Sequence, residues 1–298
     1  MNKKNLLLFS LCLSLSCQPS KGRVLHEKYS NNSKLSLSKA EWSQRGGTGQ
    51  IQRFLRDGTL STENYRHFLL QGESTQTHPY STEIATWEWF ERGECRERKS
   101  YSSSGILLQE ERFSPLGKRS VRSWFCDGAP RFIEEYSKNE EREILESGEY
   151  FSPRLEVESC IDRGEGERIV RDTEAEQILL RQKVSEGQIT EEKAYFPTGT
   201  LERVTHYAEG KREGEEQLYS PSGELLAKIP HRKGKREGKE LRFREGKVVE
   251  EISWKADVRE GPTRIFCDGS TPLIEWYHRG KRVSKIKYQL LHPFTQEE

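Results

Sequence analysis

An aromatic residue or a histidine recurs about every twelve residues along most of the chain, and this period constrains the fold most strongly. In the C-terminal half the recurring residues are Tyr195, Tyr207, Tyr219, His231, Phe243, Trp254, Phe266 and Tyr277. A turn residue follows each one three or four positions later: Gly199, Gly210, Gly223, Gly234, Gly246, Asp257, Gly269 and Gly280. The same spacing runs from Phe90 to Tyr136 in the first half. A constant internal period is the signature of a repeat architecture.

The segments between these turns have the character of short β-strands. Stretches such as "LERVTHY" and "KVVEEISW" mix β-branched, aromatic and charged residues in near-alternation, which is the strand period. Strands joined by Asp-Gly or Ser-Gly turns pair as antiparallel hairpins. Only 32% of the residues are hydrophobic and 33% are charged, which excludes a thick globular core. We predict an all-β fold, a thin, elongated antiparallel hairpin array in which aromatics of successive hairpins stack as a continuous ladder.

Two pairs of segments resemble the repeats of the bacterial MORN-variant family. They are "YFPTGTL" with "EGKREG", and "YSPSGEL" with "KGKREG". The resemblance is clear over 193–283 and degenerate over about 50–140. It implies single-layer β-hairpin sheets, and it suggests the domains 49–140 (degenerate repeats), 141–192 (irregular or distorted repeats) and 193–290 (regular repeats). A short helix over 174–188 is the alternative for part of the irregular region.

The N-terminus is typical of an export signal. Lys3 and Lys4 precede an apolar run at 6–16, which is too short to span a bilayer. The run ends at Ser16-Cys17 and resembles a lipobox, although Ser14 and Leu15 depart from the usual pattern. We therefore expect a signal peptide at 1–16, lipidation of Cys17, and a flexible tether over 17–48. The implied location is the cell envelope, with the protein anchored in a membrane on the periplasmic or surface side. An ordinary secretory signal is the alternative.

The chain lacks the sequence motifs of common catalytic and metal sites. It contains no Gly-x-Ser-x-Gly, no phosphate-binding loop, no His-Glu-x-x-His and no Cys-x-x-Cys. Its seven histidines are scattered, and no pair shows metal-ligand spacing with a third donor nearby. The formal net charge of +1 argues against a nucleic-acid partner. We expect no enzyme activity, no cofactor and no metal.

Four cysteines follow Cys17: Cys95, Cys126, Cys160 and Cys267. An even number in an exported protein is compatible with disulfides. However, Cys126 and Cys267 occupy the same position in "FCDGAPRFIEEY" and "FCDGSTPLIEWY", about twelve strands apart. In a straight array they are far beyond bridging distance, so we predict no disulfide between them.

The candidate binding residues lie in the regular repeats. Tyr207, Trp254 and Tyr277 share one register, and the basic residues of the turns that follow are Lys211, Arg212, Lys235 and Arg236. Tyrosine, tryptophan and arginine are common interface hot spots. The alternative is structural, with the aromatics stacking hairpins and the charges keeping the edge soluble.

Three classes of function are compatible with these features. The favoured one is a non-catalytic binding or scaffold lipoprotein at the cell envelope, whose repetitive sheet offers an extended surface to a protein or envelope component. An antitoxin- or immunity-like role is the alternative that the family resemblance implies. An enzyme is the third class, and no motif supports it.

Overall fold

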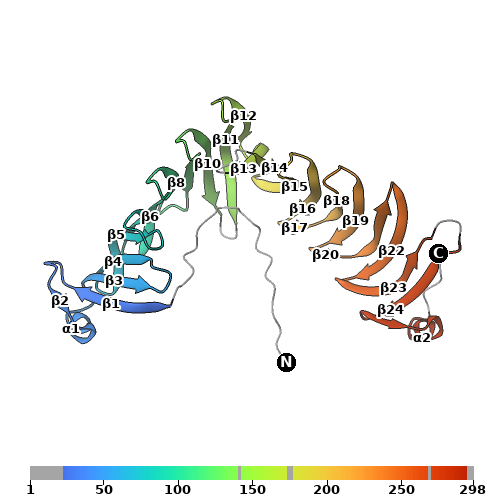
Figure 1. Ribbon diagram of the computed structural model, residues 1–298, viewed down its shortest axis with the longest axis horizontal. Helices are drawn as coiled ribbons and strands as arrows, with labels where there is room; N and C mark the ends of the chain where they lie inside the picture. Colours follow the sequence, from blue (N-terminus) through green and yellow to red (C-terminus); the bar gives the residue numbers. More distant parts are fainter. Residues whose placement is uncertain (1–22, 140–141, 173–176, 268–269, 294–298) are drawn as a thin grey trace. The chain divides into compact units, whose positions relative to one another are not determined.

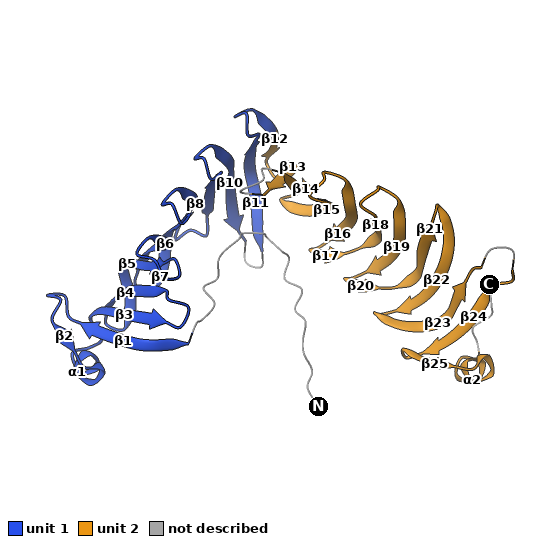
Figure 2. Ribbon diagram, viewed as in Figure 1, with its two compact units in different colours: residues 1–158 blue, residues 159–298 orange. Residues whose placement is uncertain are grey.

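The computed structural model describes residues 23–139, 142–172, 177–267 and 270–293. The chain divides into two compact units, residues 1–158 and 159–298 (Figure 2). The predicted signal peptide and Cys17 lie outside the described residues. Within the described part, no helix is long and apolar enough to cross a membrane.

Unit 1 is an antiparallel sheet with one short helix (Figure 1). Its elements are β1 (Val24–Ser30), β2 (Ser36–Leu37), α1 (Lys39–Gln44), β3 (Gly49–Leu55), β4 (Leu60–Arg66), β5 (Leu69–Thr77), β6 (Ile84–Glu91), β7 (Glu94–Tyr101), β8 (Leu107–Phe113), β9 (Arg119–Trp124), β10 (Pro130–Lys138) and β11 (Glu143–Phe151). β1 pairs with β3, and from β3 to β11 each strand pairs with the next along the chain.

Unit 2 repeats this arrangement and ends in a helix. After β12 (Val157–Asp162), which begins in unit 1, its elements are β13 (Glu165–Arg171), β14 (Ile178–Ser185), β15 (Gln188–Tyr195), β16 (Leu201–Ala208), β17 (Lys211–Arg212), β18 (Gly214–Tyr219), β19 (Leu225–Arg232), β20 (Lys235–Arg236), β21 (Gly238–Arg244), β22 (Lys247–Lys255), β23 (Val258–Ile265), β24 (Leu273–His278), β25 (Lys281–Val283) and α2 (Lys285–Leu291). Neighbouring strands are antiparallel and follow chain order. The predicted all-β array of antiparallel hairpins is confirmed.

The flexible tether predicted for 17–48 is wrong for its described part, because β1 and α1 are ordered there. Ser38 caps α1 through a capping box with Glu41, which satisfies free backbone N–H groups at the start of the helix. Trp42 on α1 then packs with Tyr29 and Ile51 in a small apolar cluster. Burying these large side chains stabilises the segment, although its Ser- and Asn-rich composition is typical of a linker.

The region 141–192 also differs from the prediction of irregular repeats. Outside 141 and 173–176, which are not described, it contains β11 to β15, and β12 to β15 pair antiparallel in chain order. The alternative of a helix over 174–188 is wrong from residue 178 onward, where β14 and β15 lie. The strands are regular although the aromatic period fades, because Ile169, Val170, Leu180 and Val184 supply the buried apolar residues there.

Two-residue turns join the hairpins of unit 2 along one edge, which we name the tight-turn edge. It comprises 163–164, 186–187, 209–210, 233–234, 256–257 and 279–280. Both residues of each turn have positive φ, for example 51° at Lys233 and 82° at Gly234. This is the geometry of type I′ turns, whose twist matches that of the paired strands. Asp257, which replaces a turn glycine in the sequence, takes the same conformation with φ of 69°.

Candidate functional site

The tight-turn edge explains why the sequence repeats Gly-Lys-Arg-Glu-Gly. In each repeat the arginine carbonyl accepts a hydrogen bond from the second residue of the following tight turn. Gly234 donates to Arg212 at 2.8 Å, Asp257 to Arg236 at 3.0 Å, and Gly280 to Arg259 at 2.9 Å. Backbone hydrogen bonds therefore join each of these turns to the preceding repeat.

The glutamate of the motif makes a second bond to the same turn. The backbone N–H of Lys233 donates to Glu213 and that of Ala256 donates to Glu237, each at 2.7 Å. The N–H of Arg279 donates to Glu260 at the same distance. A carboxylate that accepts a backbone N–H forms a charge-assisted bond, which is stronger than a neutral one. The motif therefore clamps each hairpin to the next.

The aromatic positions two residues before these turns are occupied by Tyr207, His231, Trp254 and Tyr277. Three of them bind a glutamate side chain: His231 Nε2 contacts Glu216 at 2.9 Å, Trp254 Nε1 donates to Glu240 at 2.7 Å, and Tyr277 Oη donates to Glu275 at 2.9 Å. Burial and the charge of Glu192 raise the pKa of the fourth, Tyr207.

In the last repeats of unit 2, an alternation of rings and guanidinium groups stands where a continuous ladder of stacked aromatics was predicted. The Cζ atom of Arg236 lies 3.6 Å from the ring centroid of Trp254. Arg259 lies 5.7 Å from Trp254 and 5.3 Å from Tyr277. Cation–π contact favours this order, because a guanidinium fits between two ring faces.

A chain of polar side chains crosses the strands of unit 2 where a globular protein would have an apolar core. Arg168 donates to Gln182 at 3.1 Å, and Gln182 donates to Glu192 at 2.7 Å. Arg203 donates to Glu192 at 3.4 Å, and its Nε lies 3.9 Å from Glu216. Buried polar groups are stable only when paired, so this network fixes the register of the strands.

The structure divides the predicted basic residues into two groups. Lys211 and Lys235 are exposed at the tight-turn edge. Arg212 is half-buried and lies 3.5 Å from Glu216, and Arg236 lies 3.3 Å from Asp257 besides stacking on Trp254. The two arginines therefore hold the fold together, and the two lysines are available to a partner.

Sequence reasoning missed further exposed basic residues at the same edge. They are Lys255, Arg279, Lys281 and Arg282; Arg232 and Lys233, which belong to the basic run 231–239 of the sequence, are exposed at this edge as well. At the four turns from 209–210 to 279–280 the exposed acidic side chains are fewer, namely Glu209 and Asp257, whereas Asp162, Glu165 and Glu186 are exposed at the two earlier turns. The signal was present in the 23- to 24-residue spacing of the turns at 209–210, 233–234, 256–257 and 279–280, which places their flanks in one row.

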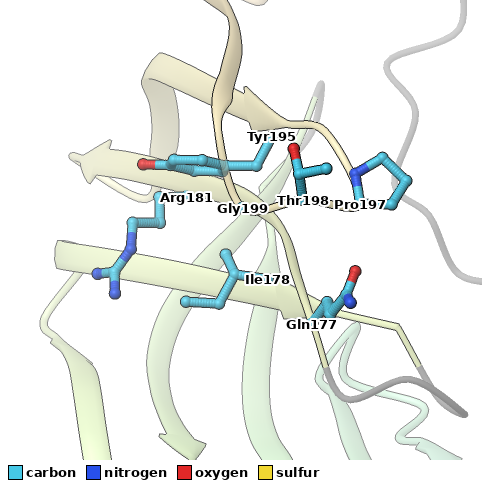
Figure 3. A pocket seen from close by; sticks show the side chains of 7 residues that line it. All are labelled: Gln177, Ile178, Arg181, Tyr195, Pro197, Thr198 and Gly199. Carbon is cyan, nitrogen blue, oxygen red and sulfur yellow. The ribbon is translucent and has the colours of Figure 1, made fainter. Parts of the chain in front are cut away.

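A shallow hollow of about 260 Å³ lies beside β14 and β15 (Figure 3). Its lining residues are Gln177, Ile178, Arg181, Tyr195, Pro197, Thr198 and Gly199. This lining offers one guanidinium and one phenol, with no carboxylate, imidazole or thiol among the described residues that form it. It has the groups to contact a ligand but not an acid–base pair for catalysis.

The four cysteines after Cys17 are free thiols in the structure, as predicted for Cys126 and Cys267. Burial and the charge of Glu88 raise the pKa of Cys95 to about 11. A thiol with such a pKa is protonated at neutral pH and is a poor nucleophile.

Comparison with known proteins supports the resemblance found in the sequence. Residues 212–233 match the MORN repeat variant. The match covers one unit of the array, from Arg212 in β17 through the β18–β19 hairpin to Lys233 in the next tight turn. The MORN-variant repeats are therefore confirmed at these residues, and repeats of this kind are consistent with a binding or scaffold module. No curated protein matches the chain.

Solved structures with distant likeness include "Crystal Structure of TcdB2-TccC3", with 12% identity and a TM-score of 0.21 over 78% of this chain. "Crystal Structure of TcdB2-TccC3-Cdc42" matches over 72% of this chain, with 11% identity and a TM-score of 0.16. This chain spans only 14% and 15% of the length of those chains, respectively. Sequence identities and TM-scores this low do not indicate a function for this chain.

Proposed function

We propose that the chain is a non-catalytic, exported lipoprotein that binds a partner at the bacterial cell envelope through the tight-turn edge of unit 2. The observation that carries this proposal is the row of exposed basic side chains at that edge, from Lys211 to Lys281. The clamped turns hold this row on rigid backbone, which lowers the entropic cost of binding. A protein or envelope component with a matching row of negative charge is the expected partner.

The proposed anchor is a lipid on Cys17. We expect Cys17→Ser to release the protein from membranes into the soluble fraction, because a cleaved lipoprotein signal leaves its membrane attachment on this residue. Fractionation of cells that express each form, with mass spectrometry of the N-terminal peptide, measures the effect. The anchor hypothesis would be contradicted if the N-terminal peptide carries no lipid and Cys17→Ser fractionates as the unmodified chain does.

The binding edge is tested by charge reversal. We expect Lys211→Glu with Lys235→Glu to abolish capture of envelope partners from solubilised membranes, and to change stability by no more than about 0.5 kcal/mol because both side chains are exposed. Arg244→Glu with Lys247→Glu is the matched control, since these exposed residues flank the turn 245–246 at the opposite edge. Equal capture by both double variants at the same salt would exclude the tight-turn edge as the binding surface.

A further inference from the structure

Three side chains of unit 2 bring their ligand atoms together at the end of the array. Glu260 belongs to β23, His278 ends β24, and His292 is the C-cap of α2. Glu260 Oε1 lies 2.9 Å from His278 Nδ1 and 3.0 Å from His292 Nε2, and the two nitrogens are 3.1 Å apart. Glu260 and His278 are 18 positions apart in the sequence, and His278 and His292 are 14 apart. The cluster therefore does not show as a short motif.

Hydrogen bonds alone do not satisfy all three contacts. An ionised carboxylate is only an acceptor, and each imidazole nitrogen either carries a proton or presents a lone pair. If both nitrogens are protonated, two donors face each other; if one or neither is, two lone pairs face each other. A metal ion between the three atoms would use all three lone pairs.

The surroundings hold each ligand in place. The second oxygen of Glu260 accepts the Arg279 N–H at 2.7 Å, which leaves Oε1 directed to the histidines. The ring of His292 stacks on Tyr288, with centroids 4.4 Å apart. Tyr288 is buried and packs on Trp276 at 4.9 Å. Such supporting contacts are typical of metal ligands, because they fix the orientation of the donor atoms.

The earlier repeats show what is specific to this site. Glu213 and Glu237 occupy the position of Glu260 and bind the next turn in the same way. The residue before that turn is Arg232 for the first and Lys255 for the second, whereas it is His278 for Glu260. Of these three repeats, the last has a histidine, which can ligate a metal, where the other two have arginine and lysine.

We propose that Glu260, His278 and His292 bind a zinc ion, with water in the fourth position. Tetrahedral zinc with bonds of about 2.0–2.1 Å separates its ligand atoms by about 3.3 Å, so outward shifts of a few tenths of an ångström suffice here. Two imidazoles and one carboxylate suit zinc better than magnesium or calcium, which prefer oxygen ligands. The ion would fasten α2 to β23 and β24, because it bridges three elements that are separated in the sequence.

The experiment uses the purified full chain after treatment with a chelator. We expect one Zn²⁺ to bind by calorimetry, one Co²⁺ to give the intense visible absorption of a tetrahedral complex, and Zn²⁺ to raise the melting temperature. His278→Ala and His292→Ala should each lower the affinity for Zn²⁺ by about a hundredfold or more, beyond the effect of removing a supporting residue. Glu260→Gln should lower it at least tenfold.

Two control variants separate the site from general effects. His206→Ala removes a histidine whose Nε2 lies 3.6 Å from the carboxylate of Glu191, and Glu237→Gln changes the equivalent glutamate of the preceding repeat. Both should bind Zn²⁺ as the unmodified chain does. Circular dichroism checks that every variant is folded. The proposal is overturned if the unmodified chain binds no Zn²⁺ at micromolar concentration, or if folded His278→Ala and His292→Ala bind it unchanged.

Discussion

Replacing Glu216 with alanine is expected to lower the free energy of unfolding by about 3–5 kcal/mol, the cost of removing one partner from a buried ionic group. Glu216 is only 5% exposed, and its carboxylate contacts His231 at 2.9 Å and Arg212 at 3.5 Å. The variant leaves both side chains, and Arg203 on the neighbouring strand, without their shared partner. Urea unfolding followed by circular dichroism measures the loss.

Glu215→Ala is the matched control for this prediction. Glu215 is the adjacent residue, but its side chain is 44% exposed and pairs with Lys228 at the surface. An exposed ion pair contributes about 1 kcal/mol or less, so this variant should unfold nearly as the unmodified chain does. If both variants cost the same, the polar network in unit 2 does not support the fold.

The same carboxylate predicts the direction of a pH effect. Burial raises the pKa of Glu216, but the hydrogen bond from His231 and the charge of Arg212 outweigh it, so the pKa lies below its ordinary value of 4.5. A group with a depressed folded-state pKa stabilises the protein above its unfolded pKa. This stability is lost as the pH falls through the folded pKa, and Glu216→Ala should flatten this acid limb of the stability curve.

Gly238→Val is expected to lower the free energy of unfolding by about 1–3 kcal/mol, the range for strained backbone positions. Gly238 has a φ of 111°, and a Cβ there would lie 3.2 Å from Pro230 Cγ. Gly214 and Gly261 end the same motif with φ of 87° and 100°. The positive φ therefore favours glycine at this position in these three repeats.

Gly246→Val separates backbone strain from the contact with Pro230. Gly246 has a φ of 73°, which is closer to the left-handed helical region, and open space surrounds its Cβ position. Its variant should lose less stability in thermal unfolding than Gly238→Val. A smaller loss at Gly238 than at Gly246 would contradict the role assigned to the motif glycine.

The strand order and the turns were predictable because both follow from local chemistry. Gly210 and Gly234 mark tight turns by residue type alone, and strands joined by such turns must pair with their neighbours. The MORN-variant resemblance was readable for the same reason, since its motif is built around these turns.

The side-chain network was not predictable from a single sequence, because its members meet across strands. Glu216 and His231 are fifteen positions apart, and only the register of β18 against β19 brings them together. Composition likewise misled the prediction of a tether, since Trp42 alone provides much of the apolar contact that orders α1. Arg212 and Arg236 were predicted to be free surface charges because their partners, Glu216 and Asp257, lie on other strands or turns and are not apparent in the sequence.

Site-specific photo-crosslinking in native membranes tests most directly whether the tight-turn edge is the binding surface. A photo-reactive residue is placed at Lys211 or Lys235, and a control at Ser222, which is exposed in the opposite loop 220–224. We predict that the same envelope component is crosslinked from Lys211 and Lys235 and is absent from Ser222. Equal crosslinking from all three positions, or from Ser222 alone, would contradict the proposed binding edge.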